Sequence, residues 1–461
     1  MQYISSRGLC PAVSFTDCLL AGLAPDGGLY VPQQFPKLDI DALKGLDYPS
    51  LAASILSHFV GSDLKTILPD LCAKSYGCDI FRHKAVVPLQ QLASDLWLLE
   101  LYHGPTIAFK DVALQLLARL MDEALAQKNQ RMLLIGATSG DTGSAAIEAC
   151  RHARHVDIVI LYPHGRVSDI QRRQMTSTGA ANVHVLAIDG DFDDCQAMVK
   201  TLFQQPPSAN IRLGAVNSIN WMRIAAQAVY YGATCMALNA TPSDPLNFVV
   251  PTGNFGNVYA AWVAKQMGFP IQQLVVASNR NDILTRTINS GVMEKQAVAP
   301  SLSPSMDIQI SSNFERLLFE LYGRDSVQLQ QIMQSFQNQG TVALAPEKLA
   351  KLQEEFSGFC VDDEQTLQSI RQTYNETGVI TDPHTAVGLA AYRHALLKGQ
   401  RSVALACAHP AKFPDTIEKA IGVRPPLPDH LGDLHQRSEH VTRLPADVAL
   451  VSQYINTHIN K

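Results

Sequence analysis

Short apolar segments alternate with stretches of helical periodicity from about residue 95 onward. The apolar segments are DLWLLEL (95–101), RMLLIGA (131–137), VDIVILYP (156–163), VHVLAID (183–189), LNFVVPTG (246–253), QLVVASN (273–279) and SVALACA (402–408). Strands that are apolar throughout and separated by helices are typical of parallel sheets covered by helices on both faces. We therefore expect an α/β fold.

The first 80 residues follow a different pattern. PSLAASILSHFVG (49–61) repeats apolar residues at helical spacing after a proline start, which predicts a helix. This region reads as a mainly helical extension of the main fold. Farther along, FQQPPSAN (203–210) and NATPSDP (239–245) are rich in turn-forming residues and are interpreted as linkers between subdomains.

Composition narrows the class of protein. Of 461 residues, 46% are hydrophobic and 17% charged, against about 25% charged in an average globular protein, and the net charge is −5. With no dense run of Lys or Arg, we expect neither a nucleic acid nor an anionic membrane surface as partner. No apolar run has the length of a membrane span, and the first residues lack the pattern of a signal peptide.

The nine cysteines include no C-x-x-C pair, and the fourteen histidines include no H-x-x-x-H pair. An odd number of cysteines without metal-ligand spacing favours a reduced cytoplasmic protein. We predict no metal site.

Lys110 lies in YHGPTIAFKDVALQ (102–115), between a glycine-proline turn and an apolar helical run. Its apolar neighbours suggest a half-buried position at the end of a helix. A lysine there is usually a solvated cation, because its ammonium group is costly to bury. The alternative is a neutral amine that forms a Schiff base with a carbonyl compound.

Two predicted strands run directly into glycine-rich turns and then into helices. In PTGNFGN (251–257), Gly253 and Gly256 leave room for backbone N–H groups to approach an anion at a helix N-terminus. The motif is neither a P-loop nor a complete G-x-G-x-x-G, which argues against a nucleotide. A phosphate site and a plain strand-to-helix turn both remain open.

The second turn, GATSGDTGSAA (136–146), places the hydroxyls of Thr138, Ser139 and Thr142 beside the start of a helix. Several neutral donors at this position suit a carboxylate. The alternative is an ordinary helix cap formed by Ser139, Asp141 or Thr142.

With these motifs assembled, the chain resembles the threonine synthases, pyridoxal-phosphate (PLP) enzymes of the tryptophan-synthase-β-like fold, called fold type II. The resemblance runs almost end to end. Its motifs are SFTDCLLAGLAPDGGLYVP, HGPTIAFKD, ATSGDTGSAA, AVNSIN, PTGNFGN, SMDIQISSNFER, DPHTAVG and AHPAKFP.

The resemblance implies two open, twisted parallel-sheet subdomains behind an N-terminal extension (1–80). Residues 81–130 with 241–461 would form a large PLP-binding domain, and residues 131–240 a small mobile subdomain that binds substrate. Lys110 would carry PLP as a Schiff base, and the backbone N–H groups of residues 253–257 would hold its phosphate. The cofactor-binding set is Lys110, Asp141, Gly253, Asn254, Phe255, Gly256, Asn257 and Cys407.

For substrate, the resemblance implies that Thr138, Ser139 and Thr142 bind an α-carboxylate and that Asn217, Ser218 and Arg223 bind a phosphate. Guanidinium suits a phosphate, although a surface cation is the alternative for Arg223. Cys407 stands where relatives usually have a threonine facing the pyridine nitrogen; alternatively it is a small apolar strand residue. His103, His384, His409 and Lys412 lie in family motifs but are left out of the predicted site.

The implied activity is conversion of O-phospho-L-homoserine and water to L-threonine and phosphate. A phospholyase of the same family, releasing a keto acid and ammonia, is the second enzymatic alternative. A non-catalytic PLP-binding protein is the third, but it would be expected to lack the lysine or one glycine turn. Oligomeric state is not determined by these motifs.

Overall fold

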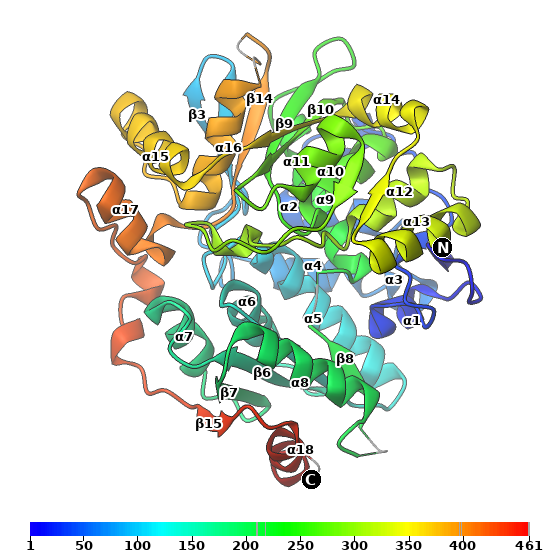
Figure 1. Ribbon diagram of the computed structural model, residues 1–461, viewed down its shortest axis with the longest axis vertical. Helices are drawn as coiled ribbons and strands as arrows, with labels where there is room; N and C mark the ends of the chain where they lie inside the picture. The colour runs from blue at the N-terminus through cyan, green and yellow to red at the C-terminus, as the bar shows by residue number, and fades with distance from the viewer. Residues whose placement is uncertain (209–210, 217, 396, 398, 460–461) are drawn as a thin grey trace.

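The structure is a computed structural model that describes residues 1–208, 211–216, 218–395, 397 and 399–459. Two α/β halves, each built on one sheet, make up most of the molecule (Figure 1). The larger half lies at the top of the view and the smaller half at the bottom. The predicted fold class is therefore confirmed.

The larger half is built on a six-stranded sheet with strand order β13-β10-β9-β14-β4-β3. The strands are β3 (Leu89–Ala93), β4 (Leu96–Glu100), β9 (Leu246–Pro251), β10 (Ile271–Ser278), β13 (Phe356–Cys360) and β14 (Ser402–Ala406). All neighbours pair in parallel except β3 and β4, which are antiparallel. The expectation of a purely parallel sheet is wrong at this edge, because only two residues connect β3 to β4 and a parallel crossover needs many more.

Alternate residues of these strands enter separate cores, as the two-residue period of a strand requires. Phe248, Val250 and Val276 pack toward α9 (Trp221–Ala237) and α10 (Gly256–Met267). Val249, Val275 and Ala404 pack toward α16 (Pro383–His394) on the other face. Both faces are covered by helices, which explains why the strands are apolar throughout.

The smaller half contains a five-stranded parallel sheet with order β15-β7-β6-β5-β8. Its strands are β5 (Met132–Ala137), β6 (Val156–Pro163), β7 (Val183–Asp189), β8 (Leu213–Ala215) and β15 (Thr442–Pro445). One face packs against α5 (Lys110–Gln127) and α6 (Asp141–Cys150), and the other against α8 (Phe192–Gln204) and α18 (Val448–His458).

The sheet topology corrects two expectations about organisation. The segment that holds β15 and α18 was assigned to the large domain, but it runs back to the smaller half, where β15 pairs with β7 (Figure 1). The stretch at 203–210 was interpreted as a linker between subdomains, yet its described residues form the end of α8 and the start of the segment that leads to β8, all within the smaller half. Proline-rich composition marks a turn but does not say which elements the turn joins.

The N-terminal region is mainly helical, as predicted. It contains a short antiparallel pair, β1 (Tyr3–Ser5) with β2 (Tyr30–Pro32), and four helices: α1 (Phe15–Ala21), α2 (Tyr48–Leu56), α3 (Ser62–Lys65) and α4 (Leu68–Tyr76). The region packs on α5 and α9, and its buried side chains share one core with both halves.

The remaining elements lie outside the two large sheets. They are α7 (Asp169–Thr176), α11 (Ile283–Ser290), α12 (Phe314–Leu321), α13 (Ser326–Gln339), α14 (Pro346–Glu355), α15 (Asp363–Thr377), α17 (Pro414–Ile421) and the strand pair β11 (Val292–Glu294) with β12 (Thr341–Ala343). Short 3₁₀ turns occur at Asp41–Leu43, Pro304–Met306, Pro410–Lys412, Asp429–Leu431 and Leu434–Gln436. Within the described ranges, no helix combines the length and the apolar character needed to cross a bilayer.

Candidate active site

The candidate site lies where strand ends of the two sheets face each other. The turn after β5 leads into α6, the turn after β9 leads into α10, and Cys407 directly follows β14. Parallel α/β sheets bind ligands outside the carboxyl ends of their strands. Lys110 belongs to the same site. It is the first residue of α5, the helix that packs against the smaller sheet.

The loop before Lys110 is fixed by its neighbour Asp111. The carboxylate of Asp111 accepts hydrogen bonds from the backbone N–H and the hydroxyl of Thr106, at 2.8 and 2.7 Å. Gly104 has to be a glycine here, because a Cβ atom at that position would lie 2.5 Å from the Cβ of Asp111. The side chain of Lys110 is consequently held inside the protein, and the residue is only 7% exposed. This is deeper than the half-buried position expected from sequence.

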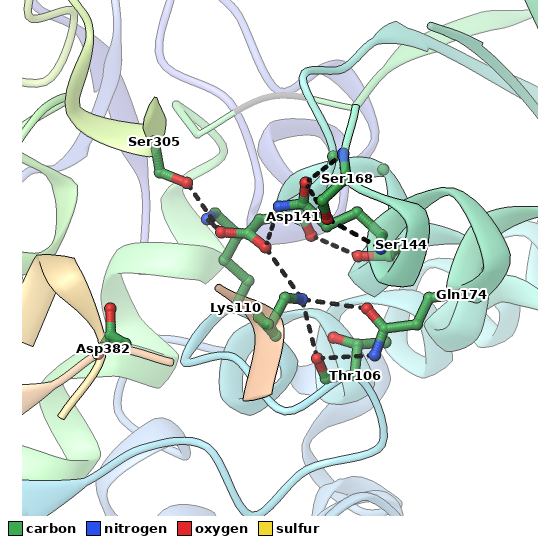
Figure 2. Close-up of polar contacts among 12 residues, drawn as sticks. Thr106, Lys110, Asp141, Ser144, Ser168, Gln174, Ser305 and Asp382 are labelled. Atoms are coloured by element: carbon green, nitrogen blue, oxygen red, sulfur yellow. Dashed lines mark hydrogen bonds and ion pairs between the residues drawn. The ribbon is translucent and has the colours of Figure 1, made fainter. Parts of the chain in front are cut away.

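Asp141, the first residue of α6, is the centre of a buried polar network (Figure 2). Its Oδ2 atom lies 3.4 Å from Lys110 Nζ and accepts a hydrogen bond from the Ser305 hydroxyl at 2.8 Å. Its Oδ1 atom lies 2.9 Å from Lys412 Nζ and accepts a hydrogen bond from Gln171 Nε2 at 2.9 Å. One carboxylate therefore contacts two lysines from distant parts of the chain.

Burial sets the protonation of Lys110. Desolvation lowers the pKa of its ammonium group; Asp141 opposes this shift, whereas the positive charges of Lys412 and Arg223 add to it. Burial alone would raise the pKa of Asp141, but Lys412, Lys110 and the hydrogen bond from Gln171 outweigh it and hold that pKa well below its usual range. Asp141 is thus an anion facing an amine that gives up its proton more readily than an exposed lysine.

The turn after β9 fits a phosphate group. No described residue accepts a hydrogen bond from the backbone N–H groups of residues 253–257. Phe255 has a φ of 61°, in the left-handed region, which places these N–H groups ahead of α10. The buried Nδ2 atom of Asn257 also has no described hydrogen-bond acceptor, while its Oδ1 atom accepts from Tyr231 at 2.7 Å. These orphaned donors match the anionic tail of the implied cofactor.

Replacing Gly253 with alanine should weaken cofactor binding by roughly tenfold. The added methyl group would overpack this turn and shift its backbone N–H groups, and overpacking costs about 1–3 kcal/mol. The added Cβ would lie 3.1 Å from both Met306 Cα and Ser305 O, which are backbone atoms and yield little. Gly256→Ala is the matched control, since its Cβ would meet a side-chain atom of Asn313 at 3.3 Å. Titration of cofactor-free protein with PLP, followed by absorbance, measures both affinities. Equal affinities would contradict the tight fit at Gly253.

The turn after β5 differs in detail from its predicted cap. The N-cap residue of α6 is Gly140, without a side-chain cap, so capping by Ser139, Asp141 or Thr142 is wrong. Instead, the Thr138 hydroxyl accepts hydrogen bonds from the N–H groups of Gly140 and Gly143, at 3.0 and 2.9 Å. Ser139 is exposed and Thr142 is half-buried. The hydroxyls that were predicted to bind a carboxylate therefore lie in one turn but differ in their exposure to solvent.

Of the residues predicted to bind the substrate phosphate, Asn217 lies outside the described residues. Ser218 is half-buried and its carbonyl accepts a hydrogen bond from Asn313, which also binds the carbonyl of Asn254. Arg223 is 3% exposed in α9, and burial lowers the pKa of its guanidinium to about 10. The alternative of a surface cation is therefore wrong for Arg223.

Cys407 is buried and its backbone carbonyl accepts a hydrogen bond from the N–H of Phe109, next to Lys110. Burial raises the pKa of its thiol, which stays neutral. All nine cysteines are free, and among the residues described no group of three or more His, Cys, Asp or Glu could hold a metal ion.

The three histidines left out of the predicted site all have partners within the protein. His103 Nε2 lies 2.7 Å from Glu100, and His384 Nδ1 lies 2.8 Å from Asp382. His409 accepts a hydrogen bond from the N–H of Ala411 through Nδ1, and burial lowers its pKa to about 4.

Sequence reasoning did not find Ser305 and Gln171 and gave no role to Lys412. Ser305 and Lys412 lie in motifs quoted for the resemblance, but a motif alone does not show which buried charged group each residue contacts. No periodicity or spacing in the sequence identifies these contacts.

Comparison with known proteins agrees with this geometry. The family model described as pyridoxal-phosphate dependent enzyme matches residues 81–408. The models for the threonine synthase N terminus and the threonine synthase C-terminal region match residues 2–76 and 385–455.

Individual relatives cover the chain from end to end. Threonine synthase from Pseudomonas aeruginosa is 48% identical, over 100% of this chain and 99% of its own. The crystal structure of PLP-bound threonine synthase from Brucella melitensis is 47% identical, covers 100% of both chains and superposes with a TM-score of 0.97. The yeast threonine synthase structure is 37% identical, with a TM-score of 0.94 and coverage of 100% of this chain and 99% of that one. The chain therefore belongs to the threonine synthase family of pyridoxal-phosphate-dependent enzymes.

Proposed function

We propose that the protein converts O-phospho-L-homoserine and water to L-threonine and phosphate, as a carbon–oxygen lyase acting on a phosphate ester. One observation carries this proposal. A buried lysine whose pKa is lowered lies at the meeting point of a cradle for the cofactor phosphate and a turn suited to a carboxylate. The nine free cysteines support the cytoplasm as its compartment.

The residues that would hold PLP come from both halves. Lys110 would bind it covalently, residues 253–257 would hold its phosphate through backbone N–H groups, and Asp141 and Cys407 would line its ring. When bound, PLP supplies an electron sink for the negative charge that develops when C–H bonds next to the amino group break. The protein's contribution is to bind, orient and move protons.

Lys110 is the proposed acid and base. Its amine has to be neutral to accept a proton from Cα of the substrate, and burial shifts it in that direction. Once protonated, the same nitrogen can return the proton. Asp141, 3.4 Å from Nζ, stabilises the charged form and fixes where the amine points.

Two anchors would hold the substrate. The α-carboxylate would bind at the start of α6, to the hydroxyls of Thr138, Ser139 and Thr142 and to the helix N-terminus. The substrate phosphate would bind at Ser218 and Arg223, because a guanidinium group can bind a phosphate through two parallel hydrogen bonds. Separate anchors at the two ends of the substrate fix which carbon faces Lys110.

We also propose that the smaller half, from about residue 131 to 240 and with β15 and α18, moves toward the larger half when substrate binds. Asp141 and Gln174 of the smaller half already contact Ser305 and Lys412 of the larger half. Closure would exclude bulk water while leaving the one molecule that adds to Cβ. Crystals with and without a substrate analogue test this; identical angles between the halves would contradict it.

Product analysis tests the reaction itself. Full-length protein loaded with PLP and mixed with O-phosphohomoserine should release threonine and phosphate in equal amounts. Chromatography of the amino acids and a phosphate assay measure both. Release of 2-oxobutanoate and ammonia with phosphate would instead assign the phospholyase activity, which needs the same lysine but no addition of water. Absence of any product would reject both.

A further inference from the structure

Lys412 is fully buried at the end of a short 3₁₀ turn, and every contact of its ammonium group is made inside the protein. Nζ lies 2.9 Å from Asp141 Oδ1 and donates hydrogen bonds to the carbonyl of Thr106 at 3.0 Å and to Oε1 of Gln174 at 3.1 Å. An ammonium has three N–H donors, and these three acceptors use them all. The position of Lys412 is therefore fixed from three directions.

The two oxygens of Asp141 divide their contacts between the two lysines. Oδ1 binds Lys412 and Gln171, whereas Oδ2 contacts Lys110 and Ser305, as Figure 2 shows for the labelled residues. The carboxylate cannot rotate without giving up one of these pairs. Since Lys412 and Gln171 hold Oδ1, they determine where Oδ2 lies relative to Lys110.

The contact between Lys412 and Asp141 also affects the balance of buried charge around Lys110. A buried carboxylate with a single cationic partner becomes an uncompensated charge when that partner loses its proton, and such a charge is costly. Lys110 has to alternate between charged and neutral forms if it transfers protons. Lys412 Nζ lies 2.9 Å from Asp141 Oδ1, so the carboxylate keeps a second lysine partner whichever form Lys110 takes.

We propose that Lys412 is a positioning residue, which holds the Asp141 carboxylate against Lys110 and keeps it ionised while Lys110 gains and loses its proton. The inference rests on the proposed role of Lys110. It adds a function for a residue that touches neither substrate nor the reacting atoms.

Other charged and titratable groups act on the same nitrogen. Besides Asp141 and Lys412, the field at Lys110 includes Arg223 from α9 and Cys407 after β14. His384 of α16 faces Asp141, and Asp111 of α5 faces Lys412. A test must therefore change Lys412 and Asp141 separately and leave these groups in place.

The experiment follows the visible spectrum of the full-length protein loaded with PLP as a function of pH, because the spectrum changes when the nitrogen of Lys110 is protonated. If Lys412 holds the Asp141 carboxylate in place and ionised, Lys412→Met releases that carboxylate, so the midpoint should fall by about one to three pH units; loss of the charge without any effect on Asp141 would raise it instead. Asp141→Asn removes the attracting anion and leaves Lys412, so the midpoint should fall by about the same amount. Lys412→Arg should restore a midpoint close to that of the original protein.

Lys265→Met is the matched control. Lys265 also pairs with a carboxylate, Glu355 at 2.9 Å, and with a backbone carbonyl, but at the end of α10. Its replacement should not move the midpoint.

The outcomes separate the possibilities. An unchanged or higher midpoint in Lys412→Met would overturn the proposal, because Asp141 would then keep its place and its charge without Lys412. If Lys412→Met does not fold, Asp141→Asn decides, and an unchanged midpoint there overturns the proposal equally. Absence of the visible band in the unmodified protein would instead refute the role of Lys110, which is a distinct result.

Discussion

Replacing Lys110 with alanine should abolish turnover while leaving the protein folded. Both the covalent hold on the cofactor and the transfer of the Cα proton depend on this amine, and positioned proton transfer alone contributes about 10²–10⁴-fold in rate. Losing both functions should reduce the rate by at least about 10⁴-fold. The visible absorption of the loaded protein should disappear at the same time.

The fold should survive because Asp141 is not left without partners. Lys412, Gln171 and Ser305 still bind its two oxygens when Lys110 is gone. A buried carboxylate that keeps a cation and two hydrogen bonds avoids the full penalty of an unpaired charge. Circular dichroism and a melting curve should therefore resemble those of the unmodified protein.

Three measurements check this prediction: the rate with O-phosphohomoserine, the absorption spectrum, and peptide mapping after borohydride reduction. The reduced pyridoxyl group should be found on Lys110 in the unmodified protein and on no peptide of Lys110→Ala. Lys265→Ala is the control for loss of a lysine elsewhere. A pyridoxyl group on another residue of the unmodified protein would remove Lys110 from its assigned role.

The strands and the glycine turns were predictable because each depends on local chemistry. A strand buried on both faces is apolar at every position, and seven such strands were found where the sequence placed them. The four edge strands, β3, β13, β8 and β15, were missed, since most of their residues are partly or fully exposed and they lack a continuous apolar run. Pairing of β15 with β7, more than 250 residues earlier in the chain, leaves no local signal in the sequence.

The sequence motifs also indicated part of the candidate site. Lys110 and the turn at 253–257 stand in motifs whose residue types match one chemistry, and they lie at the start of α5 and at the start of α10. The role of Lys412 could not be predicted in this way. Its role depends on its contact with Asp141, 271 positions earlier in the chain, and on the burial of both side chains. Long-range contacts between buried charges are a property of the fold, not of spacing.

Replacing Arg223 with alanine should mainly weaken binding of the phosphorylated substrate. Removing one partner of a buried, hydrogen-bonded charge pair costs about 2–5 kcal/mol, so KM should rise by roughly 30-fold or more. Because phosphate is also the leaving group in the proposed reaction, kcat should fall as well, but by less. Arg223→Lys keeps the charge and loses the bidentate geometry, and it should give an intermediate KM.

The structure also predicts what should not change. Arg223 is 3% exposed, and burial lowers the pKa of its guanidinium to about 10. A melting curve of Arg223→Ala should accompany the kinetics, so that a loss of binding is told apart from a loss of stability. Arg131→Ala serves as control, because Arg131 pairs with Asp157 at the surface of the smaller half and should leave KM unchanged. Competition by inorganic phosphate gives an independent reading: its inhibition constant should rise together with KM in Arg223→Ala. If neither constant moves, the substrate phosphate binds elsewhere, and Arg223 is a buried structural cation of α9.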